Sequence, residues 1–404
     1  MSKFNIDRFT AKYITKRDKS LFLSDIESNS VLLQRKIENK KILVIGGAGS
    51  IGSSFIKAIL PYRPQTLVVV DINENALAEL TRELRGTKDM FLPLDYVPYP
   101  MDYASPVFTK MFISRQGFDV VANFSAHKHV RSEKDIFSIE VMLRNNVINA
   151  KKLMDLLVQY PPEEFFCVST DKAANPVNIM GASKRIMEDL IFSYSDKFAV
   201  KTARFANVAF SNGSLLAGFI ARLQKNQPLS APADVKRYFV SLEESGHICM
   251  LACMLGNNRE IFFPKLNGEQ MMRFDIIARE FLQENGYAVM ECDSAEAAKR
   301  QIMELSADSK IYPVYFSESD TSGEKMFEEF YTDTECIDMN RFISLGVITG
   351  KNKIDSKKIY DFINNLEQMF NSGSTTKKEI INILCSYLSG FEHIETGKNL
   401  DEKM

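Results

Sequence analysis

The order of apolar and polar positions changes near residue 39. Residues 1–38 are mixed and charged with only short apolar pieces, so we expect an extension that docks on the main body. Residues 41–45 then form a continuous β-branched run, as expected of a central strand buried on both faces. A glycine-rich loop and helical spacing over residues 53–60 follow. The pattern therefore predicts a strand, a loop and a helix in succession.

Strands and helices continue to alternate beyond this unit. Strand patterns cover residues 66–70, 118–124, 164–169 and 201–205, and helical patterns cover residues 141–158 and 181–193. Strict alternation predicts a parallel, doubly wound sheet of the Rossmann type. Beyond residue 208 the alternation decays into an expected loop at 227–232, a helix at 243–255 and a short strand at 260–264. We interpret this stretch as a smaller mixed domain that caps the sheet.

These patterns predict an α/β fold with four parts. They are an N-terminal extension (1–38), a dinucleotide-binding Rossmann domain (39–208), a smaller substrate domain (209–350) and a C-terminal helical segment (351–404). The last part reads as one or two helices broken near residues 371–374, followed by a polar tail.

Composition and charge exclude several classes of function. The 404 residues include 50 basic and 52 acidic side chains, a formal net charge of −2. The chain therefore lacks the excess of positive charge that is typical of proteins that bind nucleic acid or an anionic membrane. The six cysteines lack zinc or disulfide spacing, which is typical of reduced thiols. The first residues lack the apolar core of a signal peptide, and no window reaches the ~18 uncharged apolar residues of a membrane span. We therefore expect a cytoplasmic protein with neither nucleic acid nor membrane as a partner.

Three of the four glycines between the first predicted strand and its helix have the spacing of a dinucleotide-binding loop. In dinucleotide-binding folds Gly46 would allow the tight turn, Gly49 would let the pyrophosphate approach the backbone, and Gly52 would let helix and strand pack closely. The helix N-terminus would favour the phosphate charge. Asp71 ends the next strand, where a carboxylate accepts the hydroxyls of the adenosine ribose. The loop therefore predicts a site for NAD or NADP.

The choice between the two cofactors stays open. Asp71 would repel a 2′-phosphate and favours NAD, whereas Arg82 and Arg85 in the following helix soften that preference. Asp102 is a candidate partner for the adenine amino group, and a solvated loop carboxylate is the alternative interpretation. The other cofactor contacts that we expect are Ser50, Ile51, Ala126 and Lys184.

Acidic and basic side chains follow the strand at 164–169, at the sheet edge where doubly wound folds place their chemistry. They belong to the run Thr170-Asp171-Lys172. Met180 and Lys184 are four residues apart and share one face of a helix. In short-chain dehydrogenases these positions hold a proton-transferring tyrosine and a lysine. Met180 cannot transfer a proton, and Tyr194 lies too far along the helix to replace it simply.

Four motifs together resemble the nucleotide-sugar 4,6-dehydratases, extended short-chain dehydrogenases that act on UDP-N-acetylglucosamine. They are Gly46-Gly47-Ala48-Gly49-Ser50-Ile51-Gly52, Ala126-His127-Lys128-His129-Val130, Ser169-Thr170-Asp171-Lys172-Ala173-Ala174-Asn175-Pro176 and Met180-Gly181-Ala182-Ser183-Lys184-Arg185. Further similar segments are Arg204-Phe205-Ala206-Asn207-Val208, Lys236-Arg237-Tyr238-Phe239 and Gly323-Glu324-Lys325. The similarity runs over about residues 41–332, and some dehydratases of this branch also carry the methionine.

Over its whole length the sequence most resembles dehydratases of the legionaminic acid pathway, which include members that use GDP-N-acetylglucosamine. The segments that carry this similarity are Phe262-Phe263-Pro264-Lys265 and His393-Ile394-Glu395-Thr396-Gly397-Lys398. Asn212 departs from the pattern, because relatives often have arginine there.

The resemblance implies dehydration of UDP- or GDP-N-acetylglucosamine to a 4-keto-6-deoxy sugar, with a tightly bound and recycled NAD or NADP, for bacterial glycan or nonulosonic acid synthesis. We expect Asp171 as the acid toward O6, Lys172 as the base toward C5, and Thr170 as the hydrogen-bond partner of O4. Either water or Lys172 would take the O4 proton, and the configuration at C5 stays open. The expected substrate contacts are Lys128, His129, Asn207 and Arg237, whose guanidinium suits a diphosphate unless it is a surface arginine.

Two other functions stay open. A nucleotide-sugar 4-epimerase needs only oxidation and reduction at C4 and would normally keep the tyrosine, so Asp171 with Lys172 favours dehydration. An inactive NAD-binding regulator is the second alternative, because of Met180. No metal is expected, since no carboxylate or cysteine completes a ligand set beside His127 and His129. We expect a homo-oligomer, with the helices at 141–158 and 181–193 as its dimer surface.

Overall fold

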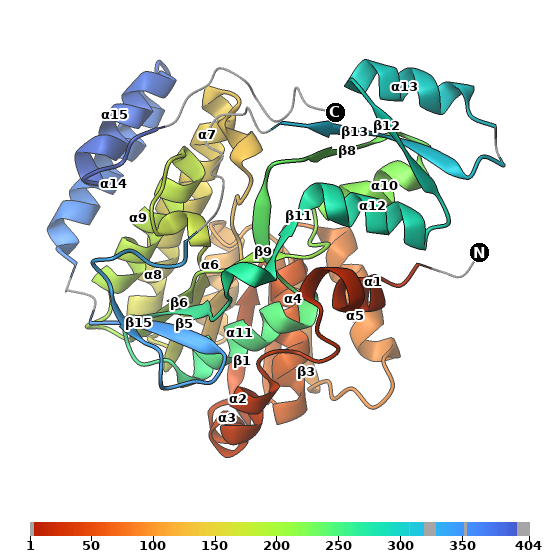
Figure 1. Ribbon diagram of the computed structural model, residues 1–404. Helices are drawn as coiled ribbons and strands as arrows, with labels where there is room; N and C mark the ends of the chain where they lie inside the picture. Colours follow the sequence, from red (N-terminus) through yellow and green to blue (C-terminus); the bar gives the residue numbers. More distant parts are fainter. Residues whose placement is uncertain (1–3, 307, 319–328, 351–353, 394–404) are drawn as a thin grey trace.

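The computed structural model describes residues 4–306, 308–318, 329–350 and 354–393 (Figure 1). The predicted motif Gly323-Glu324-Lys325 and the tail from Ile394 to Lys398 lie outside the described residues. No helix in the described ranges is long and apolar enough to cross a bilayer.

A nine-stranded sheet forms the centre of the chain, in the order β14-β15-β10-β6-β5-β4-β1-β2-β3. Its parallel strands are β1 (Lys41–Ile45), β2 (Thr66–Asp71), β3 (Asp95–Pro100), β4 (Val120–Asn123), β5 (Glu164–Val168), β6 (Ala199–Ala203) and β10 (Glu260–Pro264). The antiparallel strands β15 (Leu345–Thr349) and β14 (Cys336–Asp338) form one edge. The strand order reverses between β1 and β4, which opens a crevice at the carboxyl ends of these strands. The predicted doubly wound parallel sheet is confirmed.

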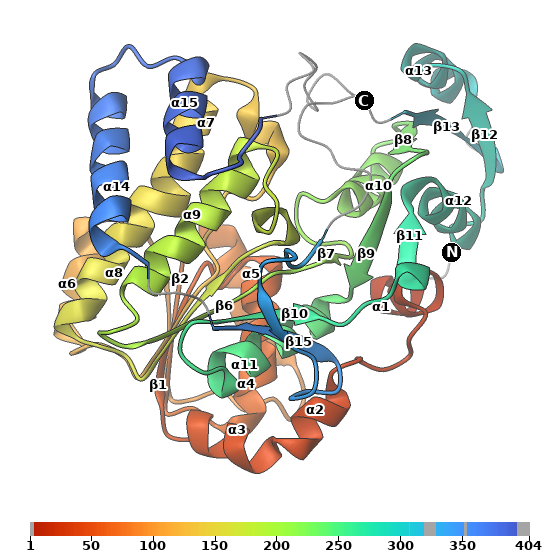
Figure 2. The same cartoon turned by 60° about the vertical axis from the view of Figure 1, so that its left-hand side comes forward.

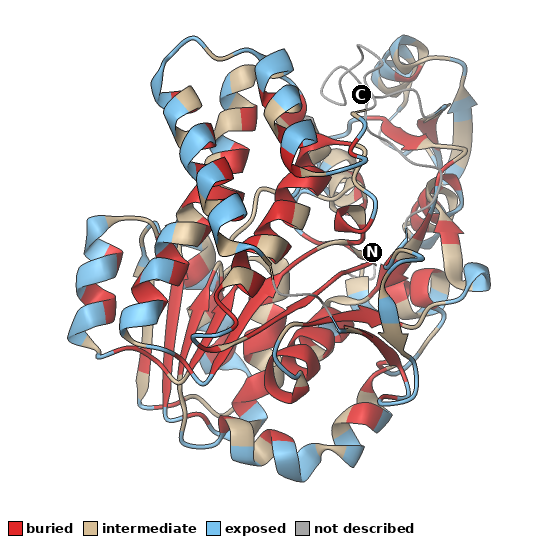
Figure 3. Cartoon of the chain, turned by 90° about the vertical axis from the view of Figure 1, so that its left-hand side faces the viewer, coloured by how far each residue is buried: buried red, intermediate tan, exposed pale blue. Residues whose placement is uncertain are grey.

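Helices cover both faces of this sheet (Figure 2). On one face α4 (Ser50–Ile59) packs against α11 (Leu242–Leu255), and on the other α8 (Ala150–Gln159) packs against α9 (Ile179–Ser193). The remaining helices of this part are α5 (Glu74–Gly86), α6 (Pro106–Ser114) and α7 (Ile136–Leu143). Buried residues concentrate in the strands and on the helix faces turned toward them (Figure 3). Both sides of the sheet are therefore covered, as its continuous apolar strands require.

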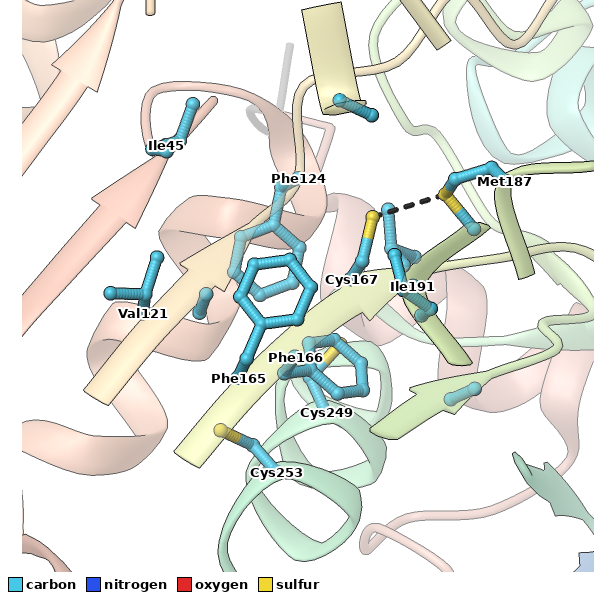
Figure 4. Packing of buried hydrophobic residues seen from close by; sticks show 14 of the residues in the cluster. Ile45, Val121, Phe124, Phe165, Phe166, Cys167, Met187, Ile191, Cys249 and Cys253 are labelled. Atoms are coloured by element: carbon cyan, nitrogen blue, oxygen red, sulfur yellow. Dashed lines mark hydrogen bonds between the residues drawn. The ribbon is translucent and has the colours of Figure 1, made fainter. Parts of the chain in front are cut away.

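Figure 4 shows this core at β5, where Phe165 and Phe166 lie among the neighbouring strands and α11. Cys249 and Cys253 of α11 and Cys167 of β5 are buried cysteines that form no disulfide.

A smaller lobe stands beyond the carboxyl edge of the large sheet (Figures 1 and 2). Its two three-stranded sheets have the orders β11-β9-β7 and β12-β13-β8. The strands are β7 (Asn207–Val208), β8 (Leu229–Pro232), β9 (Lys236–Val240), β11 (Met271–Arg273), β12 (Ala288–Cys292) and β13 (Ile311–Ser317), and the helices are α10 (Leu215–Gln224), α12 (Phe274–Glu284) and α13 (Ala295–Glu304). Phe210, Phe219 and Phe281 belong to a second apolar core inside this lobe.

Three expectations for residues beyond 208 are wrong. The helix expected in the smaller domain at 243–255 is α11, which packs on α4 against the large sheet. Residues 229–232 form strand β8 instead of a loop, because β13 pairs with them from far along the chain. Residues 260–264 form β10 of the large sheet, beside β6, and not a strand of the smaller lobe. The chain thus returns from the lobe to the large sheet, and the division into domains at residue 208 stays a prediction.

The two terminal parts both dock on the main body. The N-terminal part contains α1 (Ile6–Phe9), a π-helical turn (Thr10–Thr15), α2 (Leu23–Ser28) and α3 (Ser30–Ile37). Its Phe22 and Leu33 lie in the main core, whereas Phe9 lies in the core of the lobe. At the other end α14 (Ser356–Asn371) packs on α9, and α15 (Lys377–Tyr387) packs on α14. The helix face that we expected to meet a second subunit is therefore partly covered by α14.

Candidate active site

A cleft of about 1430 Å³ lies between the carboxyl edge of the large sheet and the smaller lobe. Most residues predicted for cofactor, catalysis and substrate line it. They are Gly46, Gly49, Ser50, Ile51, Gly52, Ala126, Lys128, His129, Thr170, Asp171, Lys172, Met180, Lys184, Asn207 and Arg237. Asp71 and Asp102 are not among its lining residues.

The glycine loop brings the backbone of β1, of α4 and of the segment after β4 into close contact. Gly46 has φ +70°, and a Cβ there would lie 2.6 Å from the amide nitrogen of Ser125. A Cβ on Gly52 would collide with the carbonyl oxygen of Gly46, so helix and strand pack as closely as the sequence predicts. Gly49 is the N-cap residue of α4, and no side chain caps the first turn of this helix. Its first amides therefore suit a phosphate that approaches from the cleft.

Asp71 lies beside the glycine loop and supports it. Its Oδ2 accepts a hydrogen bond from the amide of Ala48 at 3.1 Å, and its Oδ1 accepts one from the amide of Asn73 at 3.0 Å. The carboxylate is thus held at the end of β2, as a ribose contact requires. Asp102 is exposed and accepts a hydrogen bond from the amide of Ala104 at 2.8 Å, so the structure does not bring it into the cleft.

The acid and the base that we predicted form one pair. Thr170 Oγ1 donates to Asp171 Oδ1 at 2.8 Å, and Lys172 Nζ lies 3.1 Å from the same oxygen. The side chain of Asp171 is only 4% exposed, whereas that of Lys172 is 21% exposed. A short 3-10 turn, Asp171–Ala173, follows β5 and holds both groups at the cleft. Local chain geometry alone therefore brings the two together.

Met180 and Lys184 lie on the first turns of α9. Asn178 caps this helix, since its side chain accepts the amide of Gly181 at 2.7 Å. Lys184 is 3% exposed and donates from Nζ to the carbonyl oxygen of Val168 at 2.6 Å. Burial lowers the pKa of the Lys184 ammonium below its ordinary value. Met180 lines the cleft and is 2% exposed.

No tyrosine of the described residues lines the cleft in place of Met180. Tyr194 donates its hydroxyl to Asp155 at 2.5 Å and packs against Tyr360. Its position away from the cleft agrees with the expectation that it does not replace the tyrosine.

Asn146 is a residue of this region that the sequence analysis missed. It lies in a π-helical segment, Arg144–Asn149, between α7 and α8. Its side chain accepts from the amide of His127 and donates to the carbonyl of His127, each at 2.9 Å, and it also donates to Ser183 Oγ at 3.0 Å. It therefore fixes the cleft segment that carries Lys128 and His129. Paired asparagines within an apolar helical run were its only signal, and nothing local predicts a π turn.

Predicted substrate residues come from both sides of the cleft. Arg237 on β9 is buried, so it is not the surface arginine of the alternative interpretation. Asn207 on β7 donates to the carbonyl of Tyr238 at 3.5 Å. In the loop before α10, Gly213 has φ +75° and lies against the ring of His129, where a Cβ would be 2.9 Å from Nε2. No group of three potential metal ligands occurs among the described side chains.

Comparison with known proteins places the chain in a family. A family model described as polysaccharide biosynthesis protein matches residues 42–345. A protein of Methanocaldococcus jannaschii, named an uncharacterized membrane protein, is 30% identical over 77% of this chain and 86% of its own. The capsular polysaccharide biosynthesis protein CapD of Staphylococcus aureus is 26% identical over 76% of this chain, which spans only 50% of the CapD sequence. An inverting UDP-N-acetylglucosamine 4,6-dehydratase of Campylobacter jejuni is 22% identical over 87% of this chain and 99% of its own.

Solved structures share the fold. The protein Pen from Bacillus thuringiensis has a TM-score of 0.63 at 19% identity, over 82% of this chain and 98% of its own. A dTDP-glucose 4,6-dehydratase from Streptomyces venezuelae, solved with NAD bound, has a TM-score of 0.54 at 18% identity, over 72% and 88%. With its extended short-chain dehydrogenase fold and a family match over three quarters of its length, this chain belongs to the polysaccharide biosynthesis protein family.

Proposed function

We propose that this chain catalyses the 4,6-dehydration of a nucleoside-diphosphate N-acetylglucosamine. The product would be the 4-keto-6-deoxy sugar, and the NAD or NADP would be recycled in each turnover. The observation that carries the proposal is the Asp171–Lys172 pair in a cleft that no tyrosine of the described residues lines. An epimerase needs only the groups that assist oxidation and reduction at C4. Dehydration needs in addition a base for the C5 proton and an acid for O6. The name of the Campylobacter jejuni relative supports the same class of substrate.

The glycine loop and α4 would bind the cofactor. The chemistry that a bound nicotinamide supplies is removal of hydride from C4 of the sugar and its return to C6. Lys184 would hold the nicotinamide ribose, since its Nζ reaches the cleft edge beside β5. The NAD in the Streptomyces venezuelae structure supports this cofactor class.

Asp171 and Lys172 would move the protons. Transfer of one proton from Lys172 Nζ to Asp171 Oδ1, across 3.1 Å, converts the ion pair into a neutral base and a neutral acid. Exclusion of water by the sugar favours that neutral pair, because desolvation costs more for charges. Lys172 then takes the C5 proton while Asp171 protonates O6, which leaves as water. The ion pair is restored, and the C5 proton has in effect moved to the leaving oxygen. When hydride is returned to C6, Lys172 Nζ would give a proton to C5, and the proton released from O4 during the oxidation at C4 would replace it on the amine.

The remaining cleft residues would bind the nucleotide sugar. Arg237 would form paired hydrogen bonds with the diphosphate, as a guanidinium does. Lys128, His129 and Asn207 would contact the sugar and its phosphates, and Thr170 would bond O4. We further propose a cytoplasmic homo-oligomer that serves glycan or nonulosonic acid synthesis, with legionaminic acid and GDP-linked substrates as the specific form.

The test is incubation of the purified chain with UDP- or GDP-N-acetylglucosamine, followed by NMR of the products. We expect a 4-keto-6-deoxy sugar from one of them. Asp171→Asn should keep cofactor binding and abolish this product, whereas Asp361→Asn, on the exposed face of α14, should have no effect. A galacto product would establish an epimerase. Cofactor binding without any product would point to the inactive regulator, and near-normal turnover of Asp171→Asn would exclude the role of Asp171.

A further inference from the structure

A cluster of buried charges lies behind the catalytic turn. Arg204, directly after β6, is fully buried and grips Glu188 of α9 with two hydrogen bonds, Nε to Oε1 at 2.9 Å and Nη2 to Oε2 at 2.8 Å. The same guanidinium donates to Glu335 at 2.8 and 3.0 Å. None of these three side chains lines the cleft. The cluster therefore acts on the site only through other residues.

Helix α9 holds the end of β5 at two successive residues. Lys184 Nζ donates to the carbonyl oxygen of Val168 at 2.6 Å. One helical turn later, Glu188 Oε1 accepts from the hydroxyl of Ser169 at 2.7 Å. Thr170 and the catalytic pair follow immediately in the chain. The contact between Ser169 and Glu188 thus adds a side-chain restraint to the backbone hydrogen bond from Ser169 to Ala203, directly before the proposed acid and base.

Glu188 also balances the charge of Lys184. Burial is the main effect on this ammonium and lowers its pKa, while Glu188, four residues along the same helix, acts in the opposite direction. The other titratable group that faces Lys184 is Cys167 of β5, and burial raises the pKa of its thiol, so that it is uncharged near neutral pH. Glu188 is therefore the anionic partner that the described residues offer to Lys184.

We propose that Glu188 is a positioning residue of the catalytic centre, which fixes the end of β5 through Ser169 and supplies the counter-charge that keeps Lys184 an ammonium. Arg204 holds this carboxylate in place through two hydrogen bonds. The inference rests on the proposed function for the role of Lys184 at the nicotinamide ribose. It adds that this role requires a residue outside the cleft.

The test follows ionisation of Lys184 directly and needs no turnover. NMR of the chain labelled with ¹³C at lysine Cε, assigned with Lys184→Met, gives the titration midpoint of this group. We expect Glu188→Gln to lower the midpoint by about one pH unit, a tenfold loss of proton affinity. Glu335→Gln is the matched control, because it removes the other carboxylate on Arg204 but lies off α9. It should leave the midpoint unchanged.

A second variant protects the test against misfolding. Removing part of a buried charge cluster costs more stability than replacing all of it, so the fallback is Glu188→Gln with Arg204→Met and Glu335→Gln, and it should also lower the midpoint. Glu188→Asp keeps the charge and should restore most of the wild-type value. Equal midpoints in wild type and Glu188→Gln, or an equal fall in Glu335→Gln, would overturn the proposal. Absence of keto-sugar product with a lowered midpoint would instead overturn the proposed function alone.

Discussion

The backbone amide of Asn212 donates a hydrogen bond to the hydroxyl of Ser50, at 2.8 Å. Ser50 is the first residue of α4, and Asn212 lies in the loop that leads into α10. The contact joins the smaller lobe to the glycine loop at the end of the cleft where we place the pyrophosphate. The lobe thus helps to close the proposed cofactor site as well as the proposed substrate site.

Loss of this contact should weaken cofactor binding. Ser50→Ala removes the acceptor and leaves the Asn212 amide without it, at a cost of about 1 kcal/mol, or about fivefold in the dissociation constant of NADH. Fluorescence titration measures it. Ser53→Ala is the control, because its hydroxyl donates to the Ser50 carbonyl and does not reach the lobe. Equal affinities of the two variants would contradict the expectation.

Gly46 should tolerate no side chain. Gly46→Ala forces a left-handed φ of +70° on alanine and drives its Cβ against the backbone of Ser125, which cannot move aside easily. We expect a loss of about 2 kcal/mol in the free energy of unfolding, measured by urea denaturation, together with loss of dinucleotide binding. Gly86→Ala, at the end of α5, meets no atom within 4 Å and should be neutral or slightly stabilising. A similar loss in both variants would refute this account.

Asp71 should select NAD over NADP. Its carboxylate is held at the end of β2 by the amides of Ala48 and Asn73, where it would repel a 2′-phosphate. We expect NADH to bind at least about tenfold tighter than NADPH, which corresponds to about 1.4 kcal/mol, and Asp71→Ala to reduce this ratio. Asp102→Ala should leave the ratio as it is. Calorimetric titration with NADH and NADPH measures the ratio of the two affinities. An unchanged ratio in Asp71→Ala would count against a role of Asp71 in this selection.

Docking of the N-terminal part should weaken in acid. His247 of α11 lies 2.8 Å, Nδ1 to Oγ, from Ser20, and burial lowers the pKa of this imidazole below its ordinary value. The unfolded chain then binds more protons than the folded chain between the lowered pKa and the ordinary one, so stability rises with pH through that window. The midpoint temperature of thermal unfolding should therefore fall as the pH is lowered from about 7 to about 5. His247→Gln should flatten this slope, and an identical slope in the variant would exclude His247 as its source.

Helix α14 should prevent pairing of two chains through α8 and α9. Arg144 donates to Asn371 at 3.1 Å, and Ser356 donates to the carbonyl of Ser193 at 3.3 Å, so α14 lies along this face. Deletion of residues 354–404 would expose the apolar surface beneath it and should cause self-association, which light scattering detects. Deletion of residues 394–404 alone is the control. The expectation would be contradicted if the particles of the truncated protein contain the same number of chains as those of the intact protein.

Much of the candidate site could be predicted because its parts are local in the chain. Apolar runs identify β1, β2 and β5, and in a parallel sheet their carboxyl ends meet at one edge. The glycine loop and the turn with Asp171 and Lys172 directly follow two of these strands, so the pattern alone placed them at the same cleft. The spacing of Met180 and Lys184 placed both on one face of α9 for the same kind of reason.

Tertiary structure decided the relations between distant segments. Strand β10 joins the large sheet because β6 offers it a partner, and β8 is a strand because β13 pairs with it. The contacts of Asn212 with Ser50 and of Arg204 with Glu188 join residues whose local sequence carries no sign of the other. Local periodicity determines which face of an element is buried, but a hydrogen bond or ion pair between distant residues depends on how the whole chain packs.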